Sequence, residues 1–392
     1  MSKLEELIQQ YCPDGVEWKT LDEVCQKVFA GGTPTSSNSS YYGGDIPWLR
    51  SGEVNFNEIN STEKSITEEG YNSSSAKWIE KHSVLIAMTG ATVARSAMTM
   101  IDLTANQSVC ALTPDRSILY YRYLYYWISR SYLQLKGMAQ GALTSLNLNI
   151  IKAIEIPVPP LPVQEEIVRI LDNFTELQAE LQAELQKRKL QYNYYLDNLL
   201  NFNRGGYQEE VRWMKMSDIA KLSRGRVISK DYLQNNAGIY PVYSSQTANN
   251  GELGQINTYD YNGNYLTWTT DGAYAGTIFK RKGCFSITNV CGLIALTSEL
   301  VNLDYLYYWL KITAPSYVYK GMGNSKLMSN VMESILIPII PLSEQQRIVS
   351  ILDRFDRITN DLTTGLPAEI EKRRQQYDYY RDKLLTFKRK EA

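Results

Sequence analysis

One long stretch of this 392-residue sequence is present twice. Residues 156–202 recur as residues 337–387. Identical residues recur 181 positions later, because Ile156, Pro157, Leu161, Gln164, Ile167, Leu171, Asp172 and Phe174 match Ile337, Pro338, Leu342, Gln345, Ile348, Leu352, Asp353 and Phe355. Farther along the offset becomes 185, since the second copy contains four extra residues. A duplication of this length dictates the architecture and predicts two copies of one structural unit.

Shorter matches extend the repeat over both halves. Val16, Trp18, Leu21 and Val24 match Val211, Trp213, Met216 and Ile219, and Ile46-Pro47 matches Tyr240-Pro241. Residues 88–91, 109–112 and 123–127 have counterparts in 270–273, 290–293 and 305–309. We therefore expect a variable domain over residues 1–155, a long-helix region over 156–204, a second variable domain over 205–336 and a second long-helix region over 337–392. Glycines at Asn203-Arg204-Gly205-Gly206 favour a helix end at the boundary.

The variable domains combine strand and helix signals. Residues 84–88 form a short apolar run, and Tyr265–Thr269 follows Asn262-Gly263, which is typical of a turn. Residues 119–135 and 301–312 are predicted to be helical and are rich in tyrosine, of which the chain has 29. We interpret these tyrosines as packing residues with an outward polar tip, rather than as a binding surface. The expected fold class is mixed α/β (α+β) with internal pseudo-two-fold symmetry.

The long segments have the apolar spacing of a coiled-coil seam. Steps alternate between three and four residues, apart from extra four-residue steps. The predicted seam consists of Ile170, Phe174, Leu177, Leu181, Leu185, Tyr192, Tyr195 and Leu199 in the first segment, and Ile351, Phe355, Ile358, Leu362, Leu366, Ile370, Tyr377, Tyr380 and Leu384 in the second. Two such seams in one chain would most simply bury each other. Gly365 and Pro367 predict a local kink or break in the second helix.

A tetrapeptide is repeated in tandem within the first long segment, where residues 175–186 read TELQ-AELQ-AELQ. The simplest interpretation is a spacer of strong helix formers. A sharper hypothesis is that the number of repeats sets a length. Each tetrad adds about 6 Å of helix, against about 3.4 Å per DNA base pair. One added tetrad would then correspond to somewhat under two base pairs.

Composition excludes several classes of protein. The formal net charge is −1, so no global signal for nucleic acid or membrane binding is present. Five cysteines without CxxC spacing and one histidine, His82, make a structural zinc site improbable and fit a reducing cytoplasm. His82 is interpreted as a surface or capping residue rather than a metal ligand. No apolar run reaches membrane-spanning length, and no signal peptide opens the sequence.

These features together resemble the specificity (S) subunit of type I restriction–modification systems. The resemblance covers essentially the whole chain through the ordered variable regions, the helical copies with their PLxxQxxIxxILDxF start, and the tetrad repeat. It implies two target-recognition domains that each read one half of a bipartite DNA site. It also implies an antiparallel coiled coil that separates them, sets the spacer and recruits two methyltransferase subunits. Restriction/translocase subunits would join through the methyltransferase.

The sequence agrees with a non-catalytic role in restriction and DNA methylation. We find no GxxxxGK[ST] phosphate loop, no Asn-Pro-Pro-aromatic motif of an adenine methyltransferase and no convincing glycine-rich AdoMet loop. Catalysis is therefore expected on the partners. AdoMet, ATP and Mg are expected to bind there, with no cofactor or metal in this chain.

Polar and basic residues at predicted loops are the candidates for DNA contact. Reading a base requires donors and acceptors that reach a groove, and phosphate contacts require Lys or Arg on the same face. The candidates are Thr33, Arg50, Ser51, Thr89, Arg95, Asn106 and Gln107 in the first variable domain, and Arg224, Arg226, Lys230, Ser245, Gln246, Thr270, Tyr274, Lys280, Arg281 and Lys282 in the second. For each residue alone, a solvated loop is the simpler interpretation. Lys280-Arg281-Lys282-Gly283 is predicted to be a basic turn or a hairpin tip.

Two basic clusters, Lys187-Arg188-Lys189 and Lys372-Arg373-Arg374, occupy equivalent helical positions. A solvated helix face is the simpler interpretation, and contact with a partner or with phosphate is the main competitor. An alternative function for the whole chain is a coiled-coil scaffold without DNA binding. A self-contained restriction–modification enzyme is a third class, which the missing catalytic motifs disfavour.

Overall fold

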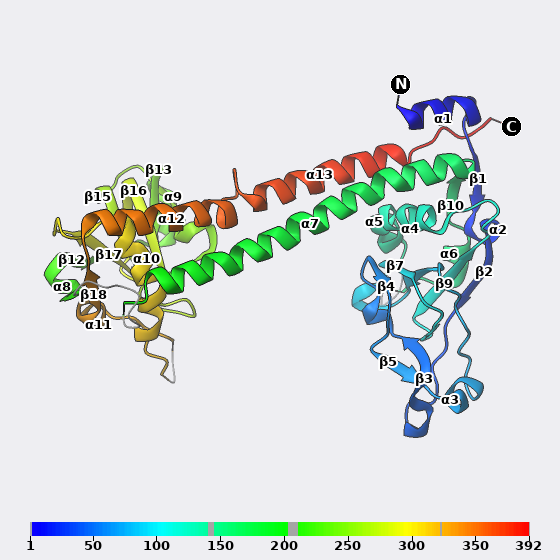
Figure 1. Cartoon of the computed structure of the whole chain (residues 1–392), viewed down its shortest axis with the longest axis horizontal. Helices are drawn as coiled ribbons and strands as arrows, with labels where there is room; N and C mark the ends of the chain where they lie inside the picture. The colour runs from blue at the N-terminus through cyan, green and yellow to red at the C-terminus, as the bar shows by residue number, and fades with distance from the viewer. Residues whose placement is uncertain (1, 140–144, 203–210, 322–323, 392) are drawn as a thin grey trace. The chain divides into compact units, whose positions relative to one another are not determined.

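The computed structural model describes residues 2–139, 145–202, 211–321 and 324–391, which belong to two compact units (Figure 1). Unit 1 comprises Met1–Leu181 with Ile370–Ala392, and unit 2 comprises Gln182–Glu369. Helix α7 (Leu161–Leu199) contributes its first half to unit 1 and its second half to unit 2. The helix end predicted at residues 203–206 lies outside the described residues.

Unit 1 is built on a mixed sheet with the strand order β2-β9-β6-β7-β4 and on a smaller sheet with the order β5-β3-β8. These strands are β2 (Cys25–Ala30), β9 (Val109–Pro114), β6 (Val84–Ala87), β7 (Ser96–Thr99), β4 (Asn57–Ile59), β5 (Lys64–Ile66), β3 (Tyr42–Leu49) and β8 (Thr104–Ala105). The helices are α1 (Lys3–Tyr11), α2 (Leu21–Val24), α3 (Glu68–Asn72), α4 (Tyr121–Arg130), α5 (Tyr132–Met138) and α6 (Leu148–Lys152). The strand predicted over 84–88 and the helical region predicted over 119–135 are confirmed.

Unit 2 contains a sheet with the strand order β12-β17-β15-β16-β13-β14. The strands are β12 (Ala220–Arg224), β17 (Cys291–Leu296), β15 (Tyr261–Thr269), β16 (Ile278–Ile287), β13 (Ala237–Tyr243) and β14 (Glu252–Ile256). The helices are α8 (Met216–Ile219), α9 (Lys230–Asn235), α10 (Leu303–Thr313), α11 (Ser329–Ser334) and α12 (Leu342–Asn360). Helix α10 confirms the prediction over 301–312.

The duplication is visible in a pair of short antiparallel ribbons. Strand β1 (Glu17–Thr20) pairs with β10 (Glu155–Val158) in unit 1, and β11 (Arg212–Lys215) pairs with β18 (Leu336–Ile339) in unit 2. Trp18 lies opposite Pro157, and Trp213 lies opposite Pro338. Each ribbon leads directly into a long helix, so the repeated sequence forms the same framework twice.

Two turn predictions in unit 2 were wrong, and the errors share a cause. Asn262-Gly263 lies inside β15, and Lys280-Arg281-Lys282-Gly283 lies inside β16. Gly263 and Gly283 are direct partners in the β15–β16 ladder and have φ values of +143° and +84°. Such φ values favour glycine, which therefore marks a paired irregularity within the hairpin rather than its tip.

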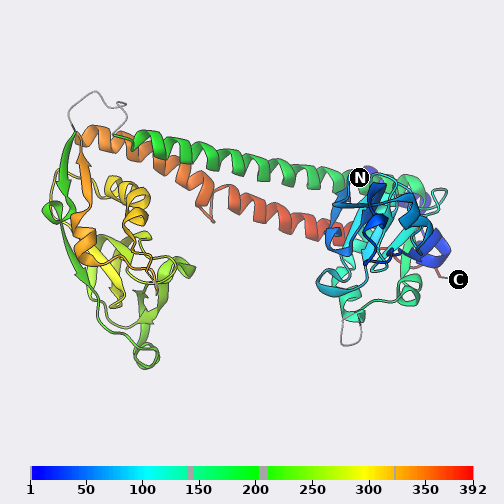
Figure 2. The ribbon, with the colours of Figure 1, turned by 90° about the horizontal axis from the view of Figure 1, so that it is seen from below.

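The coiled-coil seam forms within each unit. In unit 1, α7 and α13 (Leu366–Leu384) lie side by side, and Phe174 stacks on Tyr380 with ring centroids 5.5 Å apart (Figure 2). In unit 2, Tyr195 of α7 stacks on Phe355 of α12 at 5.1 Å. The predicted break is present, since α12 ends at Asn360 and α13 begins at Leu366. The seam assignment of Leu362 was wrong, because this residue lies in the break with 79% of its surface exposed.

The long helices also bury a second face against their own domains. Ile167 and Leu171 are fully buried in the core of unit 1, and Ile348 and Leu352 take the same places in unit 2. Burying each such side chain contributes about 1.5–3 kcal/mol. Leu196 of α7 and Leu200, directly after this helix, are buried in unit 2 as well, although the seam pattern did not select them. Packing on the domains, and not the seam alone, holds these helices.

Both ends of the described chain meet in unit 1. The backbone N–H of Lys390 donates to the carbonyl of Val16 at 2.9 Å, and Val16 and Arg389 form a parallel bridge. Leu385 is fully buried, and its carbonyl accepts a hydrogen bond from Arg130 at 2.8 Å. Unit 1 therefore requires segments from opposite ends of the sequence.

Glu166 of α7 holds helix α1 against α7 within unit 1. The stability that this contact contributes is lost at acidic pH. Its side chain is 3% exposed, Arg169 donates to both carboxylate oxygens, and Lys3 donates at 2.9 Å. These bonds, led by that from Arg169, lower the pKa of Glu166 to about 2. A lowered carboxyl pKa gives stability that is complete above the unfolded value of 4.5 and is lost as the pH falls toward 2.

We therefore expect Glu166→Gln to destabilise the protein by on the order of 1–2 kcal/mol at pH 6. The difference from wild type should shrink as the pH falls from 4.5 to 2. Chemical denaturation over this range measures it, with the neighbouring exposed Glu165→Gln as the control. A pH-independent difference would contradict the assignment.

Candidate nucleic-acid interface

In unit 1, the candidate residues gather around the loop Asn106–Ser108, directly before β9. The backbone N–H of Asn106 donates to the carbonyl of Leu49, which ends β3. The backbone N–H of Met88, directly after β6, donates to the carbonyl of Ser108. The Thr33 hydroxyl donates to the side-chain oxygen of Gln107. The loops after β2, β3 and β6 are thereby held together.

Close backbone packing positions the loop that carries Thr33. Gly31 donates its N–H to Val109 at 3.0 Å, and Gly32 donates to Ala105 at 2.8 Å. A Cβ at Gly31 would lie 2.1 Å from the carbonyl oxygen of Ala105, so glycine is required there. Thr92 donates its hydroxyl to the carbonyl of Ser51 at 3.0 Å, which links the Arg50–Ser51 loop to the Thr89 loop.

In unit 2, the loop Thr288–Val290, directly before β17, has the same central position. The N–H of Thr288 donates to Tyr243 at the end of β13, and the N–H of Asn289 donates to Arg226. The backbone N–H and the hydroxyl of Thr270 donate to the carbonyl of Val290 at 3.3 and 2.8 Å. The hydroxyl of Ser245 donates to the same carbonyl. Arg224, Arg226, Ser245 and Thr270 are therefore brought together.

The two sites have equivalent backbones and different side chains. Leu49 ends β3, which runs parallel to β8, and Tyr243 ends β13, which runs parallel to the end of β16. The match between Ile46-Pro47 and Tyr240-Pro241 predicted this correspondence. Arg50-Ser51 and Ser244-Ser245 then occupy equivalent positions after these strands. We call the two groups of loops the reading loops of unit 1 and unit 2.

The cations of the reading loops differ in how their charge is balanced. Arg50 pairs with Glu63, and Arg226 pairs with Asp260 at 3.1 Å. Arg95 donates to the neutral side chain of Asn55 at 2.9 Å. Arg224 donates to the Thr270 hydroxyl and the Asn289 carbonyl, both at 3.1 Å, and further to Ser329 and Met328. Arg224 is thus held by neutral acceptors, which leaves its positive charge available to a phosphate or a guanine.

Three further candidates lie near the reading loops of unit 2 but outside this hydrogen-bonded group. Lys230 is exposed at the start of α9, and Tyr274 is 63% exposed in the loop between β15 and β16. Gln246 directs its amide to the carbonyl of Glu252. Asn289 is exposed at the centre of the loop, and the sequence analysis missed it. The match of Val109-Cys110 with Val290-Cys291 could have found it, because it places the loop before Val290.

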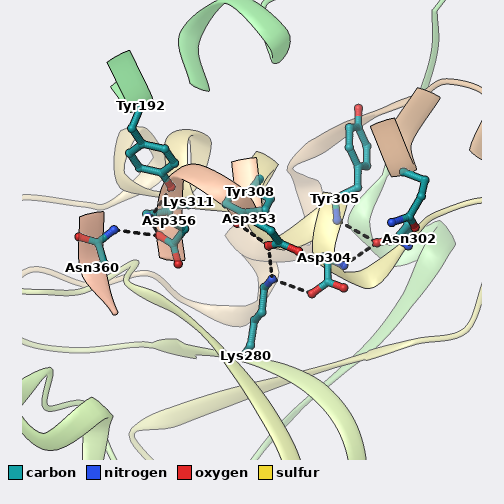
Figure 3. Close-up of polar contacts among 11 residues, drawn as sticks. Tyr192, Lys280, Asn302, Asp304, Tyr305, Tyr308, Lys311, Asp353, Asp356 and Asn360 are labelled. Carbon is teal, nitrogen blue, oxygen red and sulfur yellow. Dashed lines mark hydrogen bonds and ion pairs between the residues drawn. The ribbon is translucent and has the colours of Figure 1, made fainter. Parts of the chain in front are cut away.

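The basic run of β16 does not form a DNA-contacting turn. Arg281 is 3% exposed, lies over the ring of Tyr243 and donates to Thr267 at 3.0 Å. Lys280 points to the opposite side of the strand and pairs with Asp304 at 2.7 Å and Asp353 at 3.4 Å (Figure 3). The predicted turn was wrong, because both residues lie within β16, where alternation along the strand directs them to opposite faces of the sheet, with Arg281 buried and Lys280 held by two carboxylates. Lys282 stays exposed, away from the reading loops.

Other predicted polar sites are accounted for by local contacts. His82 stacks on Tyr121 at 4.4 Å, with the backbone in the left-handed region. Arg188 pairs with Glu184 at 2.7 Å, and Arg374 pairs with Glu371 at 2.9 Å, each within one helix turn. No cluster that could hold a metal ion occurs among the described residues. Within the same residues, no helix is long and apolar enough to cross a membrane.

A comparison with protein families identifies the family that has this duplicated arrangement. The family described as the type I restriction modification DNA specificity domain matches residues 13–188 and again residues 208–372. Each match covers one set of reading loops and part of the long-helix region that follows. The chain is a type I specificity subunit.

Curated relatives agree with this assignment, and solved structures share the fold. The MpnII specificity subunit of Mycoplasma pneumoniae is 34% identical over 309 residues, which cover 62% of this chain and 92% of that protein. The EcoR124I/EcoR124II specificity subunit of Escherichia coli is 32% identical over 315 residues, which cover 74% and 76% of the two chains. The S subunit structure from M. genitalium has a TM-score of 0.61 at 14% identity and covers 95% of this chain and 96% of that one. A second structure, from a study of type I R-M complex assembly, has a TM-score of 0.63 at 18% identity and covers 95% and 98%.

Membership in this family establishes that the specificity subunit provides DNA recognition and not catalysis. It decides against the alternative of a scaffold without DNA function. DNA and a methyltransferase are its partners in a type I complex.

Proposed function

We propose that the reading loops of unit 1 and unit 2 each read one half of an asymmetric, bipartite DNA site. The observation that supports this most is the repeated loop arrangement with different side chains. Gln107 and Thr33 lie in the loops of unit 1, whereas in unit 2 Asn289 lies in a loop and Arg224 lies beside it at the end of β12. The same backbone with different donors and acceptors would select different bases.

The long helices would set the gap between the half-sites and bind two methyltransferase subunits. Restriction and translocase subunits would join the complex through those methyltransferases. AdoMet, ATP and Mg would then bind to the partners, which supply the chemistry of methylation and DNA cleavage. The duplicated helices support this division, since two similar surfaces suit two copies of one partner.

Sequencing of modified bases tests the proposal. Cells without other DNA methylation would express the specificity subunit together with its methyltransferase. We expect one asymmetric motif with two specified halves and a fixed unspecified gap. Cells that express the methyltransferase alone provide the control. A continuous motif, or no motif while the methyltransferase is active, would refute the proposal.

Arg224→Ala is expected to weaken recognition of one half-site only. Loss of a bidentate base contact or a charged phosphate contact costs about 1–3 kcal/mol, which is about 5- to 160-fold in affinity. Competition binding with single-base substitutions at physiological salt measures the effect. Arg212→Ala, an exposed arginine in the β11 ribbon, is the matched control. Equal weakening by both variants would assign Arg224 to general electrostatic attraction.

A further inference from the structure

A buried glutamine attaches the long helix of unit 1 to its domain. Gln164 is fully buried near the start of α7. Its side-chain nitrogen donates to the carbonyls of Ile118 and Pro159 at 2.8 and 2.7 Å. Its side-chain oxygen accepts the backbone N–H of Tyr120 at 2.8 Å. One amide thereby satisfies three backbone groups where the chain enters α4 and α7.

Gln345 makes the same contacts in unit 2. It is fully buried, donates to the carbonyls of Leu300 and Ile340 at 2.8 Å each, and accepts the N–H of Asn302 at 2.8 Å. Asn302 in turn caps α10 through its side chain, as Figure 3 shows. Gln345 therefore connects the start of α12 to the start of α10, the helix on which α12 packs.

A second contact follows eight residues later along each long helix. The hydroxyl of Tyr126 donates to Asp172 at 2.6 Å, and the hydroxyl of Tyr308 donates to Asp353 at 2.6 Å (Figure 3). The cation beside the aspartate differs, being Arg122 in unit 1 and Lys280 in unit 2. Eight helical residues span about 12 Å. The tyrosines thus do not point their polar tips outward, as the sequence suggested, but use them to hold the helix.

Each set of three residues forms what we call a helix joint: Gln164, Tyr126 and Asp172 in unit 1, and Gln345, Tyr308 and Asp353 in unit 2. These polar contacts add directional constraints to the apolar packing that holds each long helix on its domain. Two contacts about 12 Å apart, one just before the neighbouring helix and one within it, fix the position and the rotation of the long helix. Because the strand orders of the two domains differ, the identity of these contacts points to a mechanical requirement that both units share.

We propose that the helix joints determine how strictly the specificity subunit selects the length of the DNA gap. This inference rests on the proposed bipartite reading. One base pair more or less displaces a half-site by about 3.4 Å and rotates it by about 35° around the DNA axis. A rigid joint transmits the length and rotation of the helix to the reading loops, so a displaced half-site is rejected. The joint residues are positioning residues and do not contact DNA.

Gln345→Glu tests the proposal with a change of almost no volume. It replaces the amide donor with a carboxylate oxygen that faces the carbonyls of Leu300 and Ile340, which loosens the joint. In the cellular methylation assay, we expect unchanged half-site sequences. Methylation at gaps one base pair longer or shorter should rise at least tenfold relative to wild type. Gln346→Glu, at the exposed neighbouring position, should keep a single gap length.

Tyr308→Phe provides a second variant that removes only the hydroxyl and keeps the packing. If Gln345→Glu gives no soluble protein, a gap distribution unchanged in Tyr308→Phe overturns the proposal. An equal loss of methylation at all gap lengths in either variant also overturns it, since that indicates a structural role alone. If the wild-type protein shows no bipartite motif, the proposed function itself fails. If the wild-type protein shows a bipartite motif with a single gap length and the variants keep that single gap length, only the proposal about the helix joints fails.

Discussion

Deleting Ala179–Gln182 from α7 is expected to bring the two DNA half-sites closer by one or two base pairs. The deleted tetrad corresponds to about 6 Å of helix, and a base pair to about 3.4 Å. A four-residue step keeps the apolar seam facing its partner. The break between α12 and α13 gives the second helix a place to absorb the change. Methylation at the native gap should be lost, and the bases within each half should stay the same.

Deleting Ala179 alone is the matched control for that experiment. One residue rotates the rest of the helix by about 100° relative to the seam, so methylation should be lost at every gap length. Base-modification sequencing of both variants measures the outcome. Altered half-site sequences in the tetrad deletion would show that the helices also influence base reading, contrary to the proposed division of roles.

Trp268→Ala is expected to destabilise unit 2 by about 3–5 kcal/mol, which is the usual cost of removing a buried tryptophan. Trp268 lies in β15 with no exposed surface, and its indole N–H donates to the carbonyl of Leu327 at 3.0 Å. The ring also fills the space beside Gly292, where a Cβ would lie 2.3 Å from it. The variant therefore leaves both a cavity and an unpaired carbonyl.

Hydrogen exchange measured by mass spectrometry can assign this loss to one unit. Peptides from β15, β16 and β17 should lose protection, while those from β6 and β9 in the separate core of unit 1 should not. Trp213→Ala is the control, because Trp213 is 37% exposed. A similar loss in both variants would contradict the central role of Trp268.

The framework of the protein was predictable because it is encoded twice. The recurrence of Ile156-Pro157 as Ile337-Pro338 anticipated equivalent ribbons, and the shared Gln and Asp positions anticipated equivalent helices. Gly365 and Pro367 correctly indicated a break in the second helix. Repetition makes such signals reliable, since chance residues rarely recur in the same order.

The candidate site was less predictable, because side-chain direction depends on tertiary pairing. Gly283 favours a turn when read alone, yet its partner across the ladder is Gly263, and the strand continues through both. Lys280 pairs with Asp353 of a helix joint, and this aspartate comes from a distant part of the sequence. Local patterns contain no information about such long-range partners.

The meeting of both chain ends in unit 1 has a consequence for biosynthesis. Unit 2 is continuous in sequence, whereas unit 1 lacks its closing helix until Ile370–Ala392 have left the ribosome. The buried position of Leu385 is filled only then. The domain whose synthesis begins first is therefore completed only after the whole of unit 2 has been translated.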